Sequence, residues 1–287
     1  MDTQHTTMTN LSVIIPIYPD FQYLTRALNS LRNQNIDIFE VICVLDGFED
    51  YSEERRFMKM YNDFRLVFLH HKENRSSLQA RITGCKHVRG DIIAFLDKDD
   101  EIDRGVYGRA VQVMNEYNAD IVRFGITDGI VEYKGICKTR MECIWFFHHK
   151  YGKFPFLTTN YIYKASLIQT AIQDLNIPED LYINLGEDIL MTPGIFCNAN
   201  VIVADPSIGN YIYHKDNEHS ITKNGKKYSD NIITVHDMVR SYCFTRGITK
   251  KDIGYKETAK GIPLYDGIQP IIPENWVEKA KKAHSYV

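Results

Sequence analysis

The sequence predicts an α/β protein with an open, mostly parallel sheet flanked by helices. Short apolar runs alternate with amphipathic segments through the first half of the chain, as parallel sheets require. One run, Asp91–Leu96, ends in three carboxylates within four positions, those of Asp97, Asp99 and Asp100. Because ligands of such sheets bind outside the carboxyl ends of the strands, this acidic end marks the expected functional site.

The elements of the first half follow from hydrophobic periodicity. Short apolar runs predict strands at Leu11–Ile17, Glu40–Leu45, Leu66–Leu69, Asp91–Leu96 and Ile121–Ile126. Apolar side chains at helical spacing predict helices at Phe21–Gln34, Glu53–Tyr61, Ser76–Val88 and Val106–Tyr117. Three of the strand ends carry polar or aromatic groups, at Tyr18, Asp46 and the acidic cluster.

The second half is less regular. Helices are expected at Met141–His149, Lys164–Leu175 and Glu187–Cys197, and Pro193 predicts a late start or a kink in the last of these. Strands are expected at Val201–Ala204 and Tyr211–His214, followed by a lysine-rich loop at Lys215–Lys227. A helix at Asn231–Thr245 and a basic amphipathic helix at Glu274–His284 complete the predicted elements.

These elements predict one main domain. Residues 1–10 form a flexible tail, 11–225 the domain, and 226–287 a small helical extension. Within the domain, the regular first half spans 11–126 and the less regular second half spans 127–225. Repeats and low-complexity segments are absent from the sequence.

Composition excludes several classes of protein. The formal net charge is −3, with 34 basic and 37 acidic residues, so nothing favours nucleic-acid binding. The six cysteines form no C-x-x-C pair, which argues against zinc and is typical of a reducing, cytoplasmic compartment. No apolar run approaches the roughly 18 residues of a membrane span, so we expect at most a peripheral contact at the inner face of a membrane.

The acidic cluster predicts a divalent cation. Clustered carboxylates repel one another unless a cation or a ligand offsets their charge. Hard cations such as Mn²⁺ and Mg²⁺ take oxygen ligands, which Asp97 and Asp99 supply. The alternative interpretation is that these side chains cap the next helix.

Taken together, six segments resemble the motifs of family-2 glycosyltransferases, in the same order. They are Leu11–Tyr18, Glu40–Gly47, Ser77–Gly84, Gly90–Asp100, Leu185–Asp188 and Tyr211–His214, the last followed by Ser220–Thr222. The resemblance covers roughly residues 11–225 and implies that 11–126 is the nucleotide-binding half and 127–225 the acceptor-binding half. It implies the Rossmann-like GT-A fold, a nucleotide-sugar donor, Mn²⁺ or Mg²⁺, and inversion at the anomeric carbon.

The resemblance also implies roles on the metal and acceptor sides. Asp99 would bind the metal, and Asp97 would face the ribose or the metal. Asp188 would be the general base, with Glu187 as the alternative base or its support. His214 would contact the metal or the diphosphate, against the alternative of a structural histidine.

Further residues are expected to bind the donor. Pro16 and Tyr18 end the first strand, and Tyr18 would stack on the base. Asp46 would accept the imide N–H of uracil, and Arg81 would bind a base carbonyl or the diphosphate. Lys223, in the lysine-rich loop, would offset diphosphate charge.

The expected reaction is transfer of one sugar, from a UDP-hexose, to a hydroxyl of a glycan or a lipid-linked acceptor. The sequence lacks the Q-x-x-R-W signature of processive relatives. Leu45 and Ile82 depart from the family pattern, which leaves the donor base open. A sugar-phosphate nucleotidyltransferase is the first alternative, although no glycine-rich loop follows the first strand. A non-catalytic nucleotide- or sugar-binding module is the second, and the oligomeric state stays open.

Overall fold

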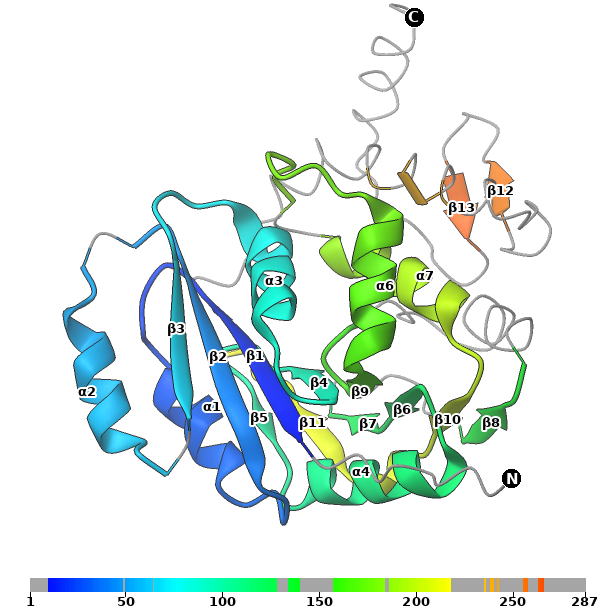
Figure 1. Cartoon of the computed structure of the whole chain (residues 1–287), viewed down its shortest axis with the longest axis horizontal. Helices are drawn as coiled ribbons and strands as arrows, with labels where there is room; N and C mark the ends of the chain where they lie inside the picture. The colour runs from blue at the N-terminus through cyan, green and yellow to red at the C-terminus, as the bar shows by residue number, and fades with distance from the viewer. Residues whose placement is uncertain are drawn as a thin grey trace, which may run out of the picture.

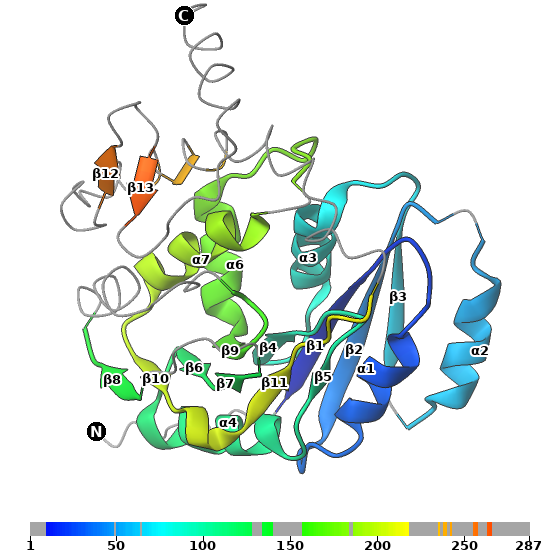
Figure 2. The same cartoon turned by 180° about the vertical axis from the view of Figure 1, so that it is seen from behind.

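The structure is a computed structural model that describes residues 10–48, 50–63, 65–127, 134–139, 157–183, 186–217, 235, 238–239, 242, 255–257 and 263–265. Several predictions lie outside these residues: the tail, the helix at Met141–His149, Lys223, and almost all of the C-terminal extension. The chain is shown from opposite sides in Figure 1 and Figure 2.

Eight strands of the described residues form the main sheet, in the order β3-β2-β1-β4-β9-β6-β10-β8. Their bounds are β1 Leu11–Ile17, β2 Ile38–Asp46, β3 Leu66–His71, β4 Ile92–Phe95, β6 Ile121–Arg123, β8 Gly135–Cys137, β9 Tyr161–Lys164 and β10 Ile202–Ala204. The pairs β1–β2, β1–β4, β2–β3 and β6–β10 are parallel. β9 and β8 run antiparallel to their neighbours. The predicted open, mostly parallel sheet is therefore confirmed.

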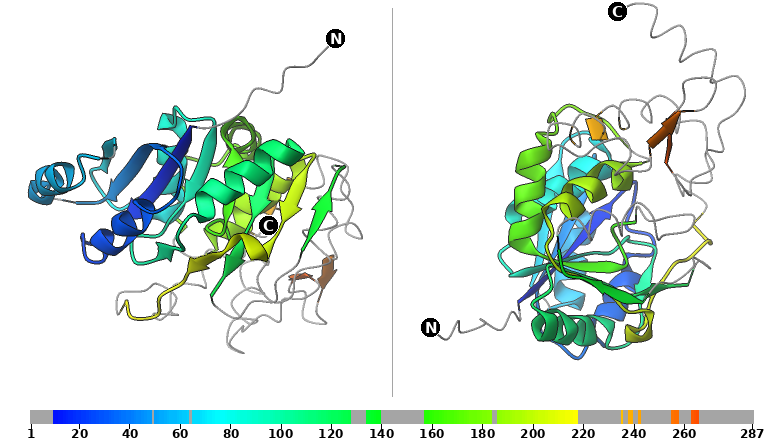
Figure 3. Two further views of the ribbon diagram at one scale, coloured as in Figure 1. Left: turned by 90° about the horizontal axis from the view of Figure 1, so that it is seen from below. Right: turned by 90° about the vertical axis from the view of Figure 1, so that its right-hand side faces the viewer.

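Helices cover both faces of this sheet (Figure 3). Their bounds are α1 Leu24–Leu31, α2 Ser52–Met60, α3 Ser76–His87, α4 Val106–Tyr117, α6 Ala165–Leu175 and α7 Glu187–Asn198. α3, α6 and α7 pack in one core, while α1, α4 and Phe57 of α2 pack in the other. No helix in the described ranges is long and apolar enough to cross a membrane.

The burial of strand β1 on both faces explains why residues 11–17 are mainly apolar. Val13 and Ile15 point into one core and Ile14 into the other, and all three are fully buried. Side chains of a strand alternate between faces, so a sheet covered on both sides needs apolar residues at every position.

A second, three-stranded sheet accounts for the main differences from expectation. It is formed by β5 Glu101–Ile102, β11 Asn210–Ile212 and β7 Gly125–Ile126. The predicted strand Ile121–Ile126 is split at Phe124, with β6 in the large sheet and β7 in the small one. This small sheet places β11 beside β5, which directly follows the acidic cluster.

Two further expectations need correction. The helix expected from Lys164 begins one residue later, because Tyr161–Lys164 is strand β9 and α6 follows it at once. Helix α7 begins at Glu187 and continues through position 193, so the late start suggested by Pro193 is wrong. Asp188 consequently lies in the first turn of α7.

Gly84 sets the approach of α3 to the sheet. A Cβ atom at this position would lie 2.5 Å from Cγ2 of Ile14, a fully buried side chain of β1. We expect Gly84→Ala to lower the free energy of unfolding by about 1–3 kcal/mol, because the core must shift to admit a methyl group. Urea unfolding measures this. The exposed Lys86 on the same helix provides the control, since Lys86→Ala should stay within about 0.5 kcal/mol of the parent.

Candidate functional site

The candidate site lies at the carboxyl ends of β1, β2 and β4. Parallel strands end at the same edge of a sheet, so the residues that follow them gather there. Tyr18 follows β1, Asp46 ends β2, and Asp97 follows β4 by one residue. Helices α3 and α7 bring Arg81 and Asp188 to the cluster, as the contacts below show.

Arg81 joins the two acidic parts of the site. Its Nη2 lies 2.7 Å from Oδ1 of Asp97, and its Nη1 lies 2.5 Å from Oε1 of Glu187. The side chains of Arg81 and Glu187 are 4% and 11% exposed, so their ion pair is shielded from solvent, whereas the side chain of Asp97 is 35% exposed. Segments that are far apart in the sequence are thus held in one charged cluster. In the structure the guanidinium of Arg81 is bonded to two carboxylates. Its predicted direct contact with a base carbonyl or the diphosphate stays a prediction.

The charges of this cluster perturb one another. Burial raises the pKa of Asp97, Arg81 opposes that rise, and the carboxylates of Asp99 and Glu187 add to it. Burial alone would lower the pKa of Arg81, but Asp97 and Glu187 raise it, so this guanidinium stays charged. The carboxylates of Asp97, Asp99 and Glu187 thus outnumber the guanidinium of Arg81, so negative charge is in excess in this cluster.

Asp188 has a separate partner. The hydroxyl of Thr158 donates a hydrogen bond to its Oδ1, at 2.6 Å. Burial and the neighbouring Glu187 raise the pKa of Asp188 to about 7, while Arg81 and the Thr158 hydroxyl act against the rise. A carboxyl group with a pKa near 7 exchanges protons readily at neutral pH, which suits a general base.

Asp100 is buried and organises the acidic turn from behind. Its Oδ2 accepts a hydrogen bond from the Tyr211 hydroxyl at 2.6 Å, and its Oδ1 accepts from the backbone N–H of His214 at 2.8 Å. The same Tyr211 oxygen accepts from the backbone N–H of Asp97 at 3.2 Å. Burial, together with the charge of Asp97, raises the pKa of Asp100 to about 8. Asp100 therefore ties β11 to the turn and is no ordinary helix cap.

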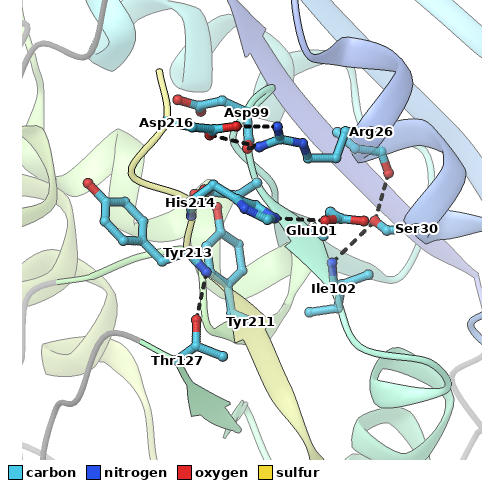
Figure 4. A network of polar contacts seen from close by, with 12 residues as sticks. Arg26, Ser30, Asp99, Glu101, Ile102, Thr127, Tyr211, Tyr213, His214 and Asp216 are labelled. Atoms are coloured by element: carbon cyan, nitrogen blue, oxygen red, sulfur yellow. Dashed lines mark hydrogen bonds and ion pairs between the residues drawn. The ribbon is translucent and has the colours of Figure 1, made fainter. Parts of the chain in front are cut away.

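Asp99 lies in a polar network between α1 and the segment after β11 (Figure 4). Arg26 donates to the backbone carbonyl of Asp99 at 3.0 Å and forms two hydrogen bonds with the carboxylate of Asp216, at 3.0 and 2.5 Å. The hydrogen bond from Arg26 lowers the pKa of Asp216 to about 2. Asn217 Nδ2 lies 2.6 Å from Oδ2 of Asp99. The backbone carbonyl and the side-chain carboxylate of Asp99 are thus both held by hydrogen bonds.

The predicted set of three metal ligands, Asp97, Asp99 and His214, needs correction. The imidazole Nε2 of His214 lies 2.7 Å from Oε2 of Glu101 instead. Within the described ranges, no group of three or more histidine, cysteine or acidic side chains is placed to hold a metal. Asp97 and Asp99 remain: one oxygen of each bonds Arg81 or Asn217, and their mutual repulsion is what a cation would relieve. This donor set fits a hard cation that takes its other ligands from a substrate.

Asp46 also differs from expectation. Its carboxylate is buried, with Oδ1 2.7 Å from Nδ1 of His71 and 2.8 Å from the backbone N of Arg75. Its Oδ2 accepts from the backbone N–H of Ser76 at 2.9 Å. Both oxygens are thus used in fixing the start of α3, and we do not assign Asp46 to the donor base.

The end of β1 keeps its expected place. Tyr18 is 47% exposed, so its ring is free to stack on a flat ligand. The carbonyl of Ile14 faces β4, and Pro16, two residues later, faces the same side. β4 ends at Phe95, opposite Ile14, so no residue of β4 lies beside Pro16. The missing N–H of Pro16 therefore costs no bond in the sheet. Lys98 fixes the acidic turn to this end of β1, because its Nζ lies 2.7 Å from Oδ1 of Asp20.

Two residues of the site carried little signal in the sequence. Thr158 lies in a short segment before β9, a strand that was not predicted. Asn217 lies in the segment expected to be a polar loop. Each reaches the site through a contact across the fold: Thr158 lies outside the recognised motifs, and Asn217 lies between the two parts of the last one.

The chain is similar in sequence to known glycosyltransferases. EpsH, a putative glycosyltransferase of Bacillus subtilis (strain 168), is 37% identical over 95 residues, which are 32% of this chain and 27% of EpsH. TarS, a poly(ribitol-phosphate) beta-N-acetylglucosaminyltransferase of Staphylococcus aureus (strain Mu50), is 26% identical over 223 residues, which are 74% of this chain and 37% of TarS. The chain thus spans less than half the length of either relative.

Solved structures share the fold. S. aureus TarS 1-349 in complex with UDP-GlcNAc has a TM-score of 0.63 at 22% identity, covering 82% of this chain and 67% of the other. The mannosyltransferase PcManGT from Pyrobaculum calidifontis, in complex with GDP-Man and Mn²⁺, has a TM-score of 0.52 at 17% identity, covering 73% and 58%. At these identities the likeness concerns the GT-A fold.

A family model adds a match over more than half of the chain. It spans residues 12–172 of 287, from β1 into α6, and contains Arg81 and the acidic turn. Asp188 lies beyond it and is placed in the site by the structure. The fold, the order of the motifs and this match together show that the chain belongs to glycosyl transferase family 2.

Proposed function

We propose that this chain is an inverting, metal-dependent glycosyltransferase that moves one sugar from a UDP-sugar to a hydroxyl group of a glycan or a lipid-linked acceptor. One observation carries the proposal. Arg81 binds both Asp97, in the acidic turn on the donor side, and Glu187, the neighbour of Asp188. The acidic turn and the Asp188 carboxylate, whose pKa lies near 7, are therefore in one cluster.

The donor side follows from the acidic turn. Asp99 and Asp97 would hold Mn²⁺ or Mg²⁺, which supplies Lewis-acid stabilisation of the charge on a diphosphate leaving group. Asn217 and Arg26 fix Asp99, and Lys98 fixes the turn to Asp20. The exposed ring of Tyr18 would stack on the nucleobase. Lys223 would be a further counter-charge, as predicted from the sequence.

The acceptor side follows from Asp188. Its carboxylate would accept the proton of the acceptor hydroxyl as that oxygen forms a bond to the anomeric carbon. The bond from this carbon to the diphosphate oxygen breaks with its electron pair, and the nucleoside diphosphate leaves. Attack from the face opposite the leaving group inverts the anomeric centre. Glu187 is paired with Arg81, so it serves as a support for Asp188 and not as the base.

The choice of donor rests on the relatives. TarS 1-349 is a complex with UDP-GlcNAc, and PcManGT is a complex with GDP-Man. TarS gives the larger TM-score and covers more of this chain, which favours a UDP-sugar, although Asp46 is not free to select uracil. The buried free thiols of Cys43 and Cys85 support a reducing, cytoplasmic compartment.

Calorimetry with UDP tests the donor side. We expect UDP to bind in the presence of Mn²⁺ and to lose at least about tenfold in affinity when a chelator removes the metal, because the diphosphate then meets the excess acidic charge of the turn. Asp99→Asn should reproduce most of that loss with Mn²⁺ present. UDP binding that is indifferent to both changes would contradict the metal role of Asp99.

A panel of UDP- and GDP-sugars, read by release of the nucleoside diphosphate, tests the activity itself. We expect release from at least one UDP-sugar and none from GDP-sugars. Metal-dependent UDP binding without release from any sugar would leave the non-catalytic binding module as the better description.

A further inference from the structure

A hydrogen-bonded chain leads from the sheet to Asp188. The hydroxyl of Tyr163, in β9, donates to the backbone carbonyl of Thr158 at 3.1 Å, and the Thr158 hydroxyl donates to Oδ1 of Asp188 at 2.6 Å. Thr158 and Tyr163 are both fully buried. The ring of Tyr163 also packs on Tyr161, at 5.6 Å between centroids, and on Phe95 of β4, at 6.0 Å. The donor to Asp188 is thus attached to the most rigid part of the fold.

This contact uses one oxygen of the carboxylate. Among the residues that the structure describes, Thr158 bonds Oδ1 and no hydrogen bond reaches Oδ2. A carboxylate held by one oxygen keeps its plane fixed while the other oxygen can accept a proton. From this geometry we propose that Thr158 is the positioning residue that orients Asp188 toward the acceptor hydroxyl. The inference rests on the proposed function of Asp188 and deepens it.

The Thr158 hydroxyl also acts on the protonation of Asp188. Glu187 on the same helix and Asp97 after β4 disfavour its charged form, while Arg81 on α3 favours it. The phenols of Tyr161 and Tyr163 face it from β9. Within this set, Thr158 is the side chain that donates a hydrogen bond to Asp188. A donor to a carboxylate stabilises the ionised form, which is the form that a base needs.

Thr158→Val tests the proposal, because it removes the hydroxyl and keeps the shape. We expect the acid limb of the pH profile of kcat to move up by about one pH unit, from about 7 to about 8. At pH 7 the ionised fraction then falls from about one half to about one tenth, so kcat should drop about fivefold and recover at pH 9. The probe is release of UDP from UDP-N-acetylglucosamine, with water as the acceptor.

Matched variants separate orientation from packing. Thr158→Ser keeps the hydroxyl and should retain the parent acid limb, whereas Thr158→Ala should shift it as Val does, which keeps the test open if the Val variant does not fold. Thr159→Val makes the same change at the next residue, which is also buried but is not bonded to Asp188. It should leave the limb in place. A parent-like limb in both Val and Ala variants, or a shift in the Ser variant as large as theirs, overturns the proposal.

A readout without turnover distinguishes the two levels of the argument. The ¹³C resonance of the Asp188 carboxyl, assigned by its loss in Asp188→Asn, should titrate about one unit higher in Thr158→Val than in Thr158→Ser. Titration shifts without any UDP release would support the Thr158 contact and contradict the proposed reaction. UDP release that is lost in Asp188→Asn, with unshifted titration in Thr158→Val, would contradict the role of Thr158 alone.

Discussion

Asp188→Asn should reduce sugar transfer by about 10²–10⁴-fold, the range in which general bases contribute. An amide keeps the shape of the carboxylate and can still accept the hydrogen bond from Thr158, but it cannot take a proton from the acceptor. The affinity for UDP and metal should change less than about threefold, since Asp188 contacts neither Asp97 nor Asp99. Steady-state rates and UDP calorimetry on the same preparations measure the two effects separately.

The same variant should unfold less readily at alkaline pH. The pKa of Asp188 lies at about 7 in the folded chain, above the usual 3.8 of an aspartate, so this carboxyl group lowers stability progressively as the pH rises from about 4 to about 7, and the full cost is present above pH 7. Below about pH 4 this cost is absent. Asp188→Asn should therefore gain about 1–3 kcal/mol in the free energy of unfolding at pH 8, with a smaller gain at pH 5.

Glu187→Gln is the matched control for the base assignment. It makes the same acid-to-amide change one residue earlier, at a side chain that is paired with Arg81. We expect it to weaken the cluster and to keep an acid limb in the pH profile of transfer, moved to lower pH because the charge of Glu187 raises the pKa of Asp188. Parent-like transfer in Asp188→Asn, or a deeper loss in Glu187→Gln, would exchange the roles of the two residues.

Arg81→Met should have the largest effect on stability. The guanidinium is 4% exposed and bonds both Asp97 and Glu187, so its removal leaves two carboxylates without their cation. Breaking a buried ion pair in this way costs about 3–5 kcal/mol. Urea unfolding at pH 7 measures the loss. A cost below about 1 kcal/mol would mean that solvent already screens the pairs.

Two companion variants locate the origin of that loss. Adding Glu187→Gln to Arg81→Met removes one of the stranded charges and should restore part of the stability, so the two changes should not be additive. Arg81→Lys keeps the charge but lacks the planar fork that reaches two carboxylates at once, and it should retain one pair at most. UDP affinity should fall in Arg81→Met because Asp97 is released from its fixed position.

The sequence is sufficient to predict strands β1, β2, β3 and β4, and the reason is physical. β1, β2 and β4 are buried on both faces and β3 is half-buried, so each is a mainly apolar run bounded by polar residues. β9 is different, because Tyr161-Ile162-Tyr163 is short and passes directly into α6, which masks the change of element. The break at Phe124 was equally hidden, since both resulting strands remain apolar and buried.

Prediction of the site shows a similar division. Asp97 and Asp188 could be selected because one follows a strand and the other lies at the start of a helix, whereas Arg81, in the middle of α3, is identified through the motif Ser77–Gly84. Asp46 has the same type of position, yet three short-range partners bind its oxygens, and such competition for hydrogen bonds is visible only in three dimensions. Thr158 meets Asp188 although the two are 30 positions apart in sequence, and it lies at a bend with no motif of its own. The division of the domain at residue 126 stays a prediction.

The place of β9 has a consequence for synthesis on the ribosome. β9 lies between β4 and β6, and it is made after both of them, once residue 164 has left the exit tunnel. Until then the nascent chain exposes one unpaired edge on β4 and both edges of β6, since the other partner of β6, β10, is made later still. Open strand edges of this kind pair readily with other chains. Fragments that stop before β9 should therefore aggregate, while chains extended through β10 should close the sheet.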